Sequence, residues 1–422
     1  MSPLPTLRDS ARREMPPELR KDVRLLGGLL GEVLTESEGP GLLEDVERLR
    51  HLLISGRARD EDELAAERLV EGWDLARAEQ VARAFTCYFH LVNLAEDHHR
   101  ARVLRSREHE LGNLRESLAA TVTEIRESQG EERLREQLRG LELRPVLTAH
   151  PTEARRRAVV SSIRRISTRL ERLDDPRCSE QEAADARRSL LEEIEILWRT
   201  AQLRQTPLTP MDEVRSALAV FDWSLYDVAP RLYRDLDTIL SPDDAGRRPP
   251  LVGAFLHMGS WVGGDRDGNP NVTSRITAQA MEEASAQAVR FLRARINAVA
   301  REITSDEEGT PPSAELVQRL AEAAAGDPER MDEILQRSPG EPHRQFLILL
   351  AETLPAALVE GTGARLLDDL RLAQRSLAEA GAGRTAYGRL QDLIWQVETF
   401  GLHLVELEVR QHSEVHARAL EE

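Results

Sequence analysis

The sequence predicts a largely α-helical α/β protein that holds only the first strands of a partial parallel β/α barrel of the TIM type. Apolar residues recur at three- and four-residue spacing over most of the 422 residues, as in amphipathic helices. Three short apolar runs without this period interrupt the helices, and each ends in polar residues. Buried strands of a barrel that carries its chemistry at their carboxyl ends have this pattern. Three strands cannot close a barrel, so either the fold is smaller or the chain covers part of one.

Residues 1–140 are predicted to form an N-terminal helical region. The helical spacing runs from Leu19 to about Gly140, as in LAAERLVEGWDLARAEQVARAF. Residues 141–422 are predicted to hold the first part of the barrel with long helical insertions. Further helices are expected over residues 155–173, 179–203, 211–240, 274–303 and on to 399, with loop-like breaks between 305 and 340.

Each of the three strand-like runs is bounded by residues that stop regular structure. RPVLTAHPT opens with Pro145 and closes at Pro151, so its end is expected in a loop. LVGAFLHMGS follows the polar loop of residues 241–250, and a glycine-rich segment comes after it. GLHLVELEVRQHS gives the third run, which ends at Arg410 and Gln411.

Composition excludes several classes of function. A formal net charge of -17 argues against a nucleic-acid or membrane-surface binder, because both need a positive field. The two cysteines, Cys87 and Cys178, have neither metal-ligand spacing nor a disulfide framework, which favours a reducing cytoplasm. No apolar run approaches the length of a membrane span.

The first chemical candidate is His150 in VLTAHPTEARRR. A histidine between a strand end and Pro151 has a restricted backbone, and its imidazole can hold or move a proton near neutral pH. Taken alone, the position favours a core histidine bonded to a backbone carbonyl. The arginines at 155–157 change this little, because one or two of them must face solvent on a helix.

The second candidate is the glycine-rich segment GSWVGGDRDGNPNVT, residues 259–273. Its glycines let the backbone approach a ligand, Arg266 can fork onto a carboxylate or phosphate, and neighbouring carboxylates can orient that arginine. A glycine-rich turn capped by aspartates explains the segment equally well. The residues expected to shape the loop are Gly263, Gly264, Asp265, Asp267 and Gly268.

Two ligand motifs are rejected for this segment. DRDGN resembles the start of a calcium loop, but Pro270 stands at the required glycine and Ile276 at the final glutamate. Neither a G-x-G-x-x-G spacing nor a Gly-Lys-Ser/Thr phosphate loop is present. No residue of this chain is assigned to a metal.

The third candidate is Arg410 in LEVRQHS. An arginine at the end of a strand is more often a salt-bridge partner than a phosphate ligand, so alone it indicates little.

Taken in order along the chain, these segments resemble the phosphoenolpyruvate carboxylases. TAHPTE with the following Arg156 is similar to that family's histidine signature, GSWVGGDRDGNPNVT to its glycine-rich signature, and LEVRQHS to its L-D-x-R-Q-[DE]-S strand end. HLVNLAEDHHRAR and EIEILWRTAQLRQTPLTPMDEVR resemble helical segments around the barrel entrance. The resemblance covers most of the chain.

The resemblance implies an activity and a division of roles. Such enzymes form oxaloacetate and phosphate from phosphoenolpyruvate and bicarbonate, by way of carboxyphosphate, carbon dioxide and an enolate. By motif position, His150 would assist carboxyphosphate breakdown, Trp261 would wall the pocket for carbon dioxide, and Arg410 would grip the phosphate. Arg266 would contact substrate indirectly or shape its loop. The family also implies Mg²⁺ and a homotetramer.

Departures from the family pattern matter as much. The catalytic-lysine motif G-Y-S-D-S-x-K-D, the F-H-G-R-G-G loop and the acidic magnesium ligands do not occur in this sequence. Glu408 replaces the usual aspartate, and His412 replaces the acidic residue after Gln411. We therefore expect an N-terminal portion that is inactive alone and needs a C-terminal complementary half. The alternatives are a non-catalytic helical interaction or regulatory protein, or a truncated gene product.

Overall fold

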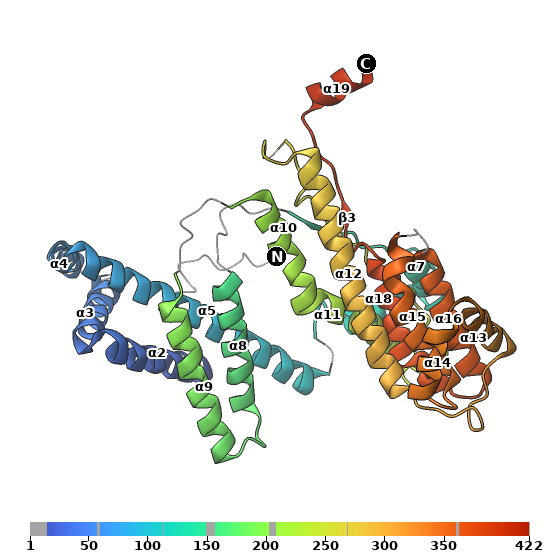
Figure 1. The fold of residues 1–422 in the computed structure, drawn as a ribbon. Coiled ribbons are helices and arrows are strands. Elements are labelled where there is room, and N and C mark those ends of the chain that lie inside the picture. The colour runs from blue at the N-terminus through green and yellow to red at the C-terminus, as the bar shows by residue number, and fades with distance from the viewer. Residues whose placement is uncertain are drawn as a thin grey trace. The chain divides into compact units, whose positions relative to one another are not determined.

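The protein is described by a computed structural model that covers residues 15–56, 60–112, 114–148, 157–201, 208–267, 269–359 and 363–421. Helices make up most of it, and the strands form one small parallel sheet (Figure 1). Contacts divide the chain into two compact units. Unit 1 combines Met1–Gly112 with Thr152–Pro207, and unit 2 combines Asn113–Pro151 with Leu208–Glu422.

Unit 1 is a layer of helices in which α2 packs on α3, α5 and α9, and α8 packs on α9. The buried side of α2 carries leucines at helical spacing, among them Leu26, Leu30 and Leu34. The helices are α2 (Pro17–Glu38), α3 (Pro40–Gly56), α4 (Asp60–Glu71), α5 (Leu75–Leu111), α8 (Arg157–Asp174) and α9 (Glu180–Arg199).

Unit 2 holds the sheet and the larger helical core. Its strands are β1 (Val146–Leu147), β2 (Gly259–Ser260) and β3 (Glu406–Leu407). Its helices are α6 (Leu118–Gln129), α7 (Glu131–Arg139), α10 (Pro210–Val220), the π-helical turn η1 (Phe221–Leu225), α11 (Tyr226–Leu240), α12 (Ser274–Glu302), α13 (Ala314–Gly326), α14 (Pro328–Arg337), α15 (Pro342–Val359), α16 (Gly363–Glu379), α17 (Gly383–Tyr387), α18 (Arg389–Phe400) and α19 (Ser413–Glu421).

Side-chain caps fix several helix starts. Ser179 and Glu182 form a reciprocal capping box at the start of α9. Thr209 and Asp212 do the same for α10, where Pro210 occupies the first turn and needs no hydrogen-bond partner. Thr273 caps α12 directly after the glycine-rich segment. These polar residues satisfy backbone donors that the helices cannot satisfy themselves.

The helix expected over residues 211–240 is interrupted by the π-helical turn η1. Pro230 follows inside α11, where it has no N–H to donate to the carbonyl four residues before it. That carbonyl, of Tyr226, accepts instead from Gln396 Nε2 at 2.7 Å. A distant side chain thus replaces the missing backbone bond and makes the proline tolerable here.

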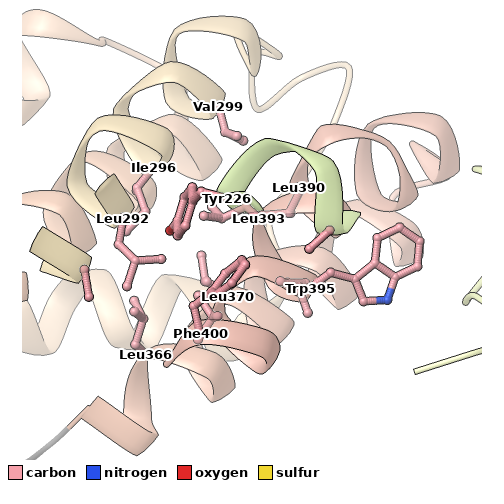
Figure 2. Packing of buried hydrophobic residues seen from close by; sticks show 14 of the residues in the cluster. Tyr226, Leu292, Ile296, Val299, Leu366, Leu370, Leu390, Leu393, Trp395 and Phe400 are labelled. Carbon is pink, nitrogen blue, oxygen red and sulfur yellow. The ribbon is translucent and has the colours of Figure 1, made fainter. Parts of the chain in front are cut away.

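The core of unit 2 lies among α11, α12, α15, α16 and α18 (Figure 2). Tyr226 stacks on Phe400 with ring centroids 5.0 Å apart, and the Tyr233 hydroxyl lies 2.8 Å from Thr399 Oγ1. Trp395 is fully buried beside them. This packing fixes the end of α18 close to the start of the segment that becomes β3.

The sheet has the order β1-β2-β3 with every pair parallel. Its strands are only two residues long, shorter than the apolar runs that predict them. A parallel bridge of Leu143 with Leu256 continues the pairing before β1. Gly259 N donates to the Pro145 carbonyl, but Pro145 has no N–H to return a bond to His257. This gap separates the bridge from β1.

Candidate functional site

Several of the predicted site residues lie where β2 and β3 leave the sheet. The pairing passes from Ser260 opposite Leu407 to an isolated bridge of Asp265 opposite Arg410. Five steps along the β2 side therefore match three along the β3 side, so two extra residues bulge out of the ladder. The Asp265 N–H donates to the Trp261 carbonyl at 2.9 Å and closes this bulge.

Two glycines permit the bulge. Gly263 has a φ of 91°, in the region that disfavours side chains, and a Cβ there would lie 2.7 Å from Ala280 Cβ. A Cβ on Gly264 would collide with the carbonyl oxygen of Glu408. Neither position accepts a larger residue unless its neighbours move.

Trp261 is the first residue after β2, and both its backbone and its ring are held. Its N–H donates to the Leu147 carbonyl at 2.8 Å, which fixes it beside the end of β1. Its indole Nε1 donates to Glu408 Oε2 at 2.7 Å. The ring is half-buried. The carboxylate of Glu408, in the segment that follows β3, therefore restrains the orientation of the ring.

Arg410 lies over this ring, with Cζ 3.8 Å from the Trp261 centroid. Such a stack of a guanidinium on an indole is a cation–π contact. An Asp265 oxygen lies 3.7 Å from Arg410 Nη1, which is an ion pair but longer than a hydrogen bond. The Arg410 side chain is 42% exposed, and its guanidinium donates no hydrogen bond to any described residue, which leaves donors for a ligand.

The segment after β3 has two different sides. Leu407 and Val409 line an apolar cavity of about 250 Å³, together with residues of α10 and α12 such as Leu218 and Ala284. Glu408 and Arg410, in alternate positions, contact Trp261 instead. One side of the segment is thus suited to packing and the other to polar chemistry.

Arg266 and Asp267 differ from Arg410 in their surroundings. The Arg266 backbone N–H donates to the Arg410 carbonyl at 2.9 Å, while its side chain points to Thr277 Oγ1 at 3.5 Å. Its Nε is buried without a hydrogen-bond partner among the described residues. Asp267 is exposed. Arg266 is therefore directed toward the first turns of α12.

Two predicted site residues, His150 and Gly268, lie outside the described residues. Among the described residues, the structure brings together Trp261, Asp265 and Arg410.

A metal ion has no evident place in the described part of the chain. No three His, Cys, Asp or Glu side chains within those ranges lie close enough together to hold one. Burial raises the pKa of Glu213 on α10, with neighbouring Asp212 adding to the effect, but these two form no such group. None of the helices in the described ranges combines the length and the apolar character that a bilayer crossing needs.

Sequence reasoning overlooked one contact in the cluster. Glu408 drew notice only as a replacement for aspartate, yet it holds the ring of Trp261. Its spacing two residues before Arg410 was the available signal, since alternate residues of an extended segment share a side. His412, the second departure, accepts a hydrogen bond from Glu414 N at the start of α19.

The polar residues at the carboxyl ends of the parallel strands place the chain in the class of parallel-sheet proteins that carry their sites at strand ends. The family model for phosphoenolpyruvate carboxylase matches residues 19–422. Phosphoenolpyruvate carboxylases of Roseiflexus castenholzii, Pseudomonas paraeruginosa and Bradyrhizobium diazoefficiens are 37%, 35% and 33% identical, over 97%, 97% and 96% of this chain. The chain belongs to the phosphoenolpyruvate carboxylase family.

The chain spans about half the length of these curated relatives. The matches cover 46% of the Roseiflexus protein, 46% of the Pseudomonas protein and 44% of the Bradyrhizobium protein.

Proposed function

We propose that this chain supplies part of the active site of a phosphoenolpyruvate carboxylase, which forms oxaloacetate and phosphate from phosphoenolpyruvate and bicarbonate. In this proposal the three parallel strands belong to a β/α barrel of the TIM type. One observation carries it: Arg410 lies on Trp261 at the strand ends, with a partly exposed guanidinium that donates no hydrogen bond within the described part of the chain. A guanidinium in that state is suited to the oxygens of a phosphoryl group.

The residues divide the work as follows. Arg410 binds the phosphoryl oxygens and offsets the charge that they gain during transfer to bicarbonate. Trp261 provides an apolar wall that keeps water from carbon dioxide. His150 assists carboxyphosphate breakdown by holding or moving a proton. Arg266 holds the glycine-rich segment against α12 and acts on substrate only indirectly, as its contact with Thr277 suggests.

Mg²⁺, which the family uses, finds no cluster of three His, Cys, Asp or Glu side chains among the described residues. We assign no step to it in this chain. A complete enzyme would take its metal ligands from residues outside the described set, and the isolated chain would be inactive. We further propose a cytoplasmic protein that forms a homotetramer when complete.

The β3 edge is the place where the remainder of the barrel would join. β3 has a strand partner on one side only among the described residues. The apolar cavity beside it is lined by Val405, Leu407 and Val409. Because the relatives are about twice as long as this chain, a C-terminal complementary half is the occupant that we propose.

The test joins this chain to the portion of the Roseiflexus relative that lies outside the match. Oxaloacetate formation, followed by its enzymatic reduction, should appear in the joined protein and not in the chain alone. The chain purified free of host enzyme should stay at background. Oxaloacetate from the chain alone would refute the proposed inactivity, and none from a folded joined protein would refute the proposed function.

The role of His150 is tested in the joined protein by His150→Asn, which keeps a polar side chain but cannot accept a proton. We expect bicarbonate-dependent phosphate release to continue while pyruvate replaces oxaloacetate. Oxaloacetate at the parent rate would make His150 structural. Loss of phosphate release together with substrate binding would place it in the binding site.

A further inference from the structure

We propose that Glu408 is a positioning residue, which fixes the indole of Trp261 as a platform and thereby orients the Arg410 guanidinium. The proposal deepens the proposed function and rests on it in one respect, that the ligand of Arg410 is a phosphoryl oxygen. The orientation itself rests on the contacts of three side chains in unit 2.

The Glu408 backbone is held on both sides. Its N–H donates to the Ser260 carbonyl at 2.9 Å, and its own carbonyl lies against Gly264 so closely that no Cβ would fit there. The side chain therefore starts from a fixed point. From there a single hydrogen bond of 2.7 Å, accepted from Trp261 Nε1, defines where the carboxylate and the indole meet.

Glu408 acts on Arg410 through the ring and not by an ion pair. Within the described part of the chain, Arg410 has its ion pair with Asp265, at 3.7 Å, and none with Glu408. A 3.7 Å contact between partly exposed charges restrains a long side chain weakly. The stack on Trp261, with Cζ 3.8 Å from the ring centroid, restrains the whole plane of the guanidinium, and this is the restraint through which Glu408 acts.

The charge on Glu408 also strengthens the platform. A carboxylate that accepts from the indole N–H polarises the ring and makes its face more negative, which favours the cation above it. Stacking occupies the face of the guanidinium and leaves its in-plane N–H donors free. The result is an arginine that is oriented before the ligand arrives, which lowers the ordering cost of binding.

The experiment uses the full chain labelled with 5-fluorotryptophan and followed by ¹⁹F NMR. Trp261→Phe assigns the Trp261 resonance, and the buried Trp395 serves as an internal control for folding. Glu408→Ala should move the Trp261 resonance and leave the Trp395 resonance unchanged. When Arg410→Met is added to Glu408→Ala, the Trp261 resonance should not move further. Glu408→Gln keeps an acceptor for the indole N–H, so its Trp261 resonance should remain near the parent position.

Titration with inorganic phosphate gives the functional readout. Glu408→Ala should weaken phosphate binding about tenfold, the size of one cation–π restraint, and Glu408→Gln should recover most of the loss. The inference would be overturned if the Trp261 resonance of Glu408→Ala still responded to Arg410→Met. Uncoupling in a chain whose parent form does not bind phosphate would support the positioning role and count against the phosphate assignment of the proposed function.

Discussion

Two arginine–tryptophan pairs among the described residues of unit 2 lie in opposite surroundings. Arg234 lies over Trp395 with Cζ 4.9 Å from the ring centroid, and that ring is fully buried in the core of Figure 2. Arg410 lies over Trp261 at 3.8 Å, at the end of the sheet. The two pairs share their chemistry, so the difference lies in what else each guanidinium contacts.

Arg234 uses its donors within the fold. It donates to the carbonyls of Tyr387 and Gly388 at 2.7 and 2.8 Å and to Asp392 Oδ1 at 2.6 Å. Besides its stack on Trp261, the Arg410 guanidinium has one ion pair among the described residues, the 3.7 Å contact with Asp265. The contrast teaches that an arginine with its donors occupied holds loops together, whereas one with open donors is available to an anionic ligand.

The largest effect that would test this contrast is expected from Arg410→Met in the joined protein. Methionine keeps an apolar contact with the ring but removes every donor and the charge. We expect oxaloacetate formation to fall by roughly a thousandfold or more, since arginines on a transferring phosphoryl group have effects of this size. The free energy of unfolding should hardly change. Parent activity in this variant would remove Arg410 from the site.

The reverse outcome is expected of Arg234→Met. This change removes the hydrogen bonds of Arg234 to Asp392 and to two backbone carbonyls, although the Gly388 carbonyl keeps its bonds from Gln391 N and Asp392 N. Loss of hydrogen bonds from a partly buried charged group costs on the order of 2 kcal/mol of unfolding free energy. Denaturant titration of the chain measures it, with Arg410→Met as the matched control. Equal losses of stability in the two variants would erase the distinction between the pairs.

A buried histidine of unit 2 should lower the free energy of unfolding at acid pH. His343 is fully buried, and burial lowers its pKa from 6.5 to about 4, while its Nε2 lies 2.8 Å from Ser376 Oγ. Above pH 6.5 both folded and unfolded forms are neutral. As the pH falls from 6.5 toward 4, only the unfolded chain gains a proton, so stability declines by on the order of 3 kcal/mol.

Denaturant titrations at several pH values between 4 and 7 measure this loss. His343→Gln removes the titrating group and should flatten that part of the profile. An unchanged slope in the variant would assign the acid sensitivity to other groups.

The sequence predicted those features whose causes are local. Prolines bounded the first strand run, polar residues marked the strand ends, and helical spacing predicted most of the helices. The three strands proved shorter than their apolar runs, partly because Pro145 leaves a gap in the ladder. That gap could be read from the chain only once the partner of Pro145 was known.

Other features depend on residues far apart in the chain. Pro230 is tolerated inside α11 because Gln396 replaces its missing bond, a contact that no local pattern indicates. Trp261 and Arg410 were each predicted for the site, but their stacking and the part of Glu408 follow from the register of β2 and β3. The motifs predicted which residues belong to the site, whereas the register between the strands determines which of their side chains are in contact.

Asp265→Asn is expected to give the smallest effect. It tests most directly whether the Arg410 guanidinium is available to an anionic ligand. At 3.7 Å the Asp265 carboxylate is too far to hold Arg410 by a hydrogen bond, yet its charge competes with an incoming anion. Asparagine keeps the shape and the backbone bridge but removes that charge. We expect phosphate to bind about two- to fivefold more tightly, which is the size of one charge interaction near the surface. Phosphate titration at low and high salt measures both the gain and its screening. A loss of affinity would show instead that Asp265 orients Arg410, and the guanidinium would then be held by a carboxylate as Arg234 is held by Asp392.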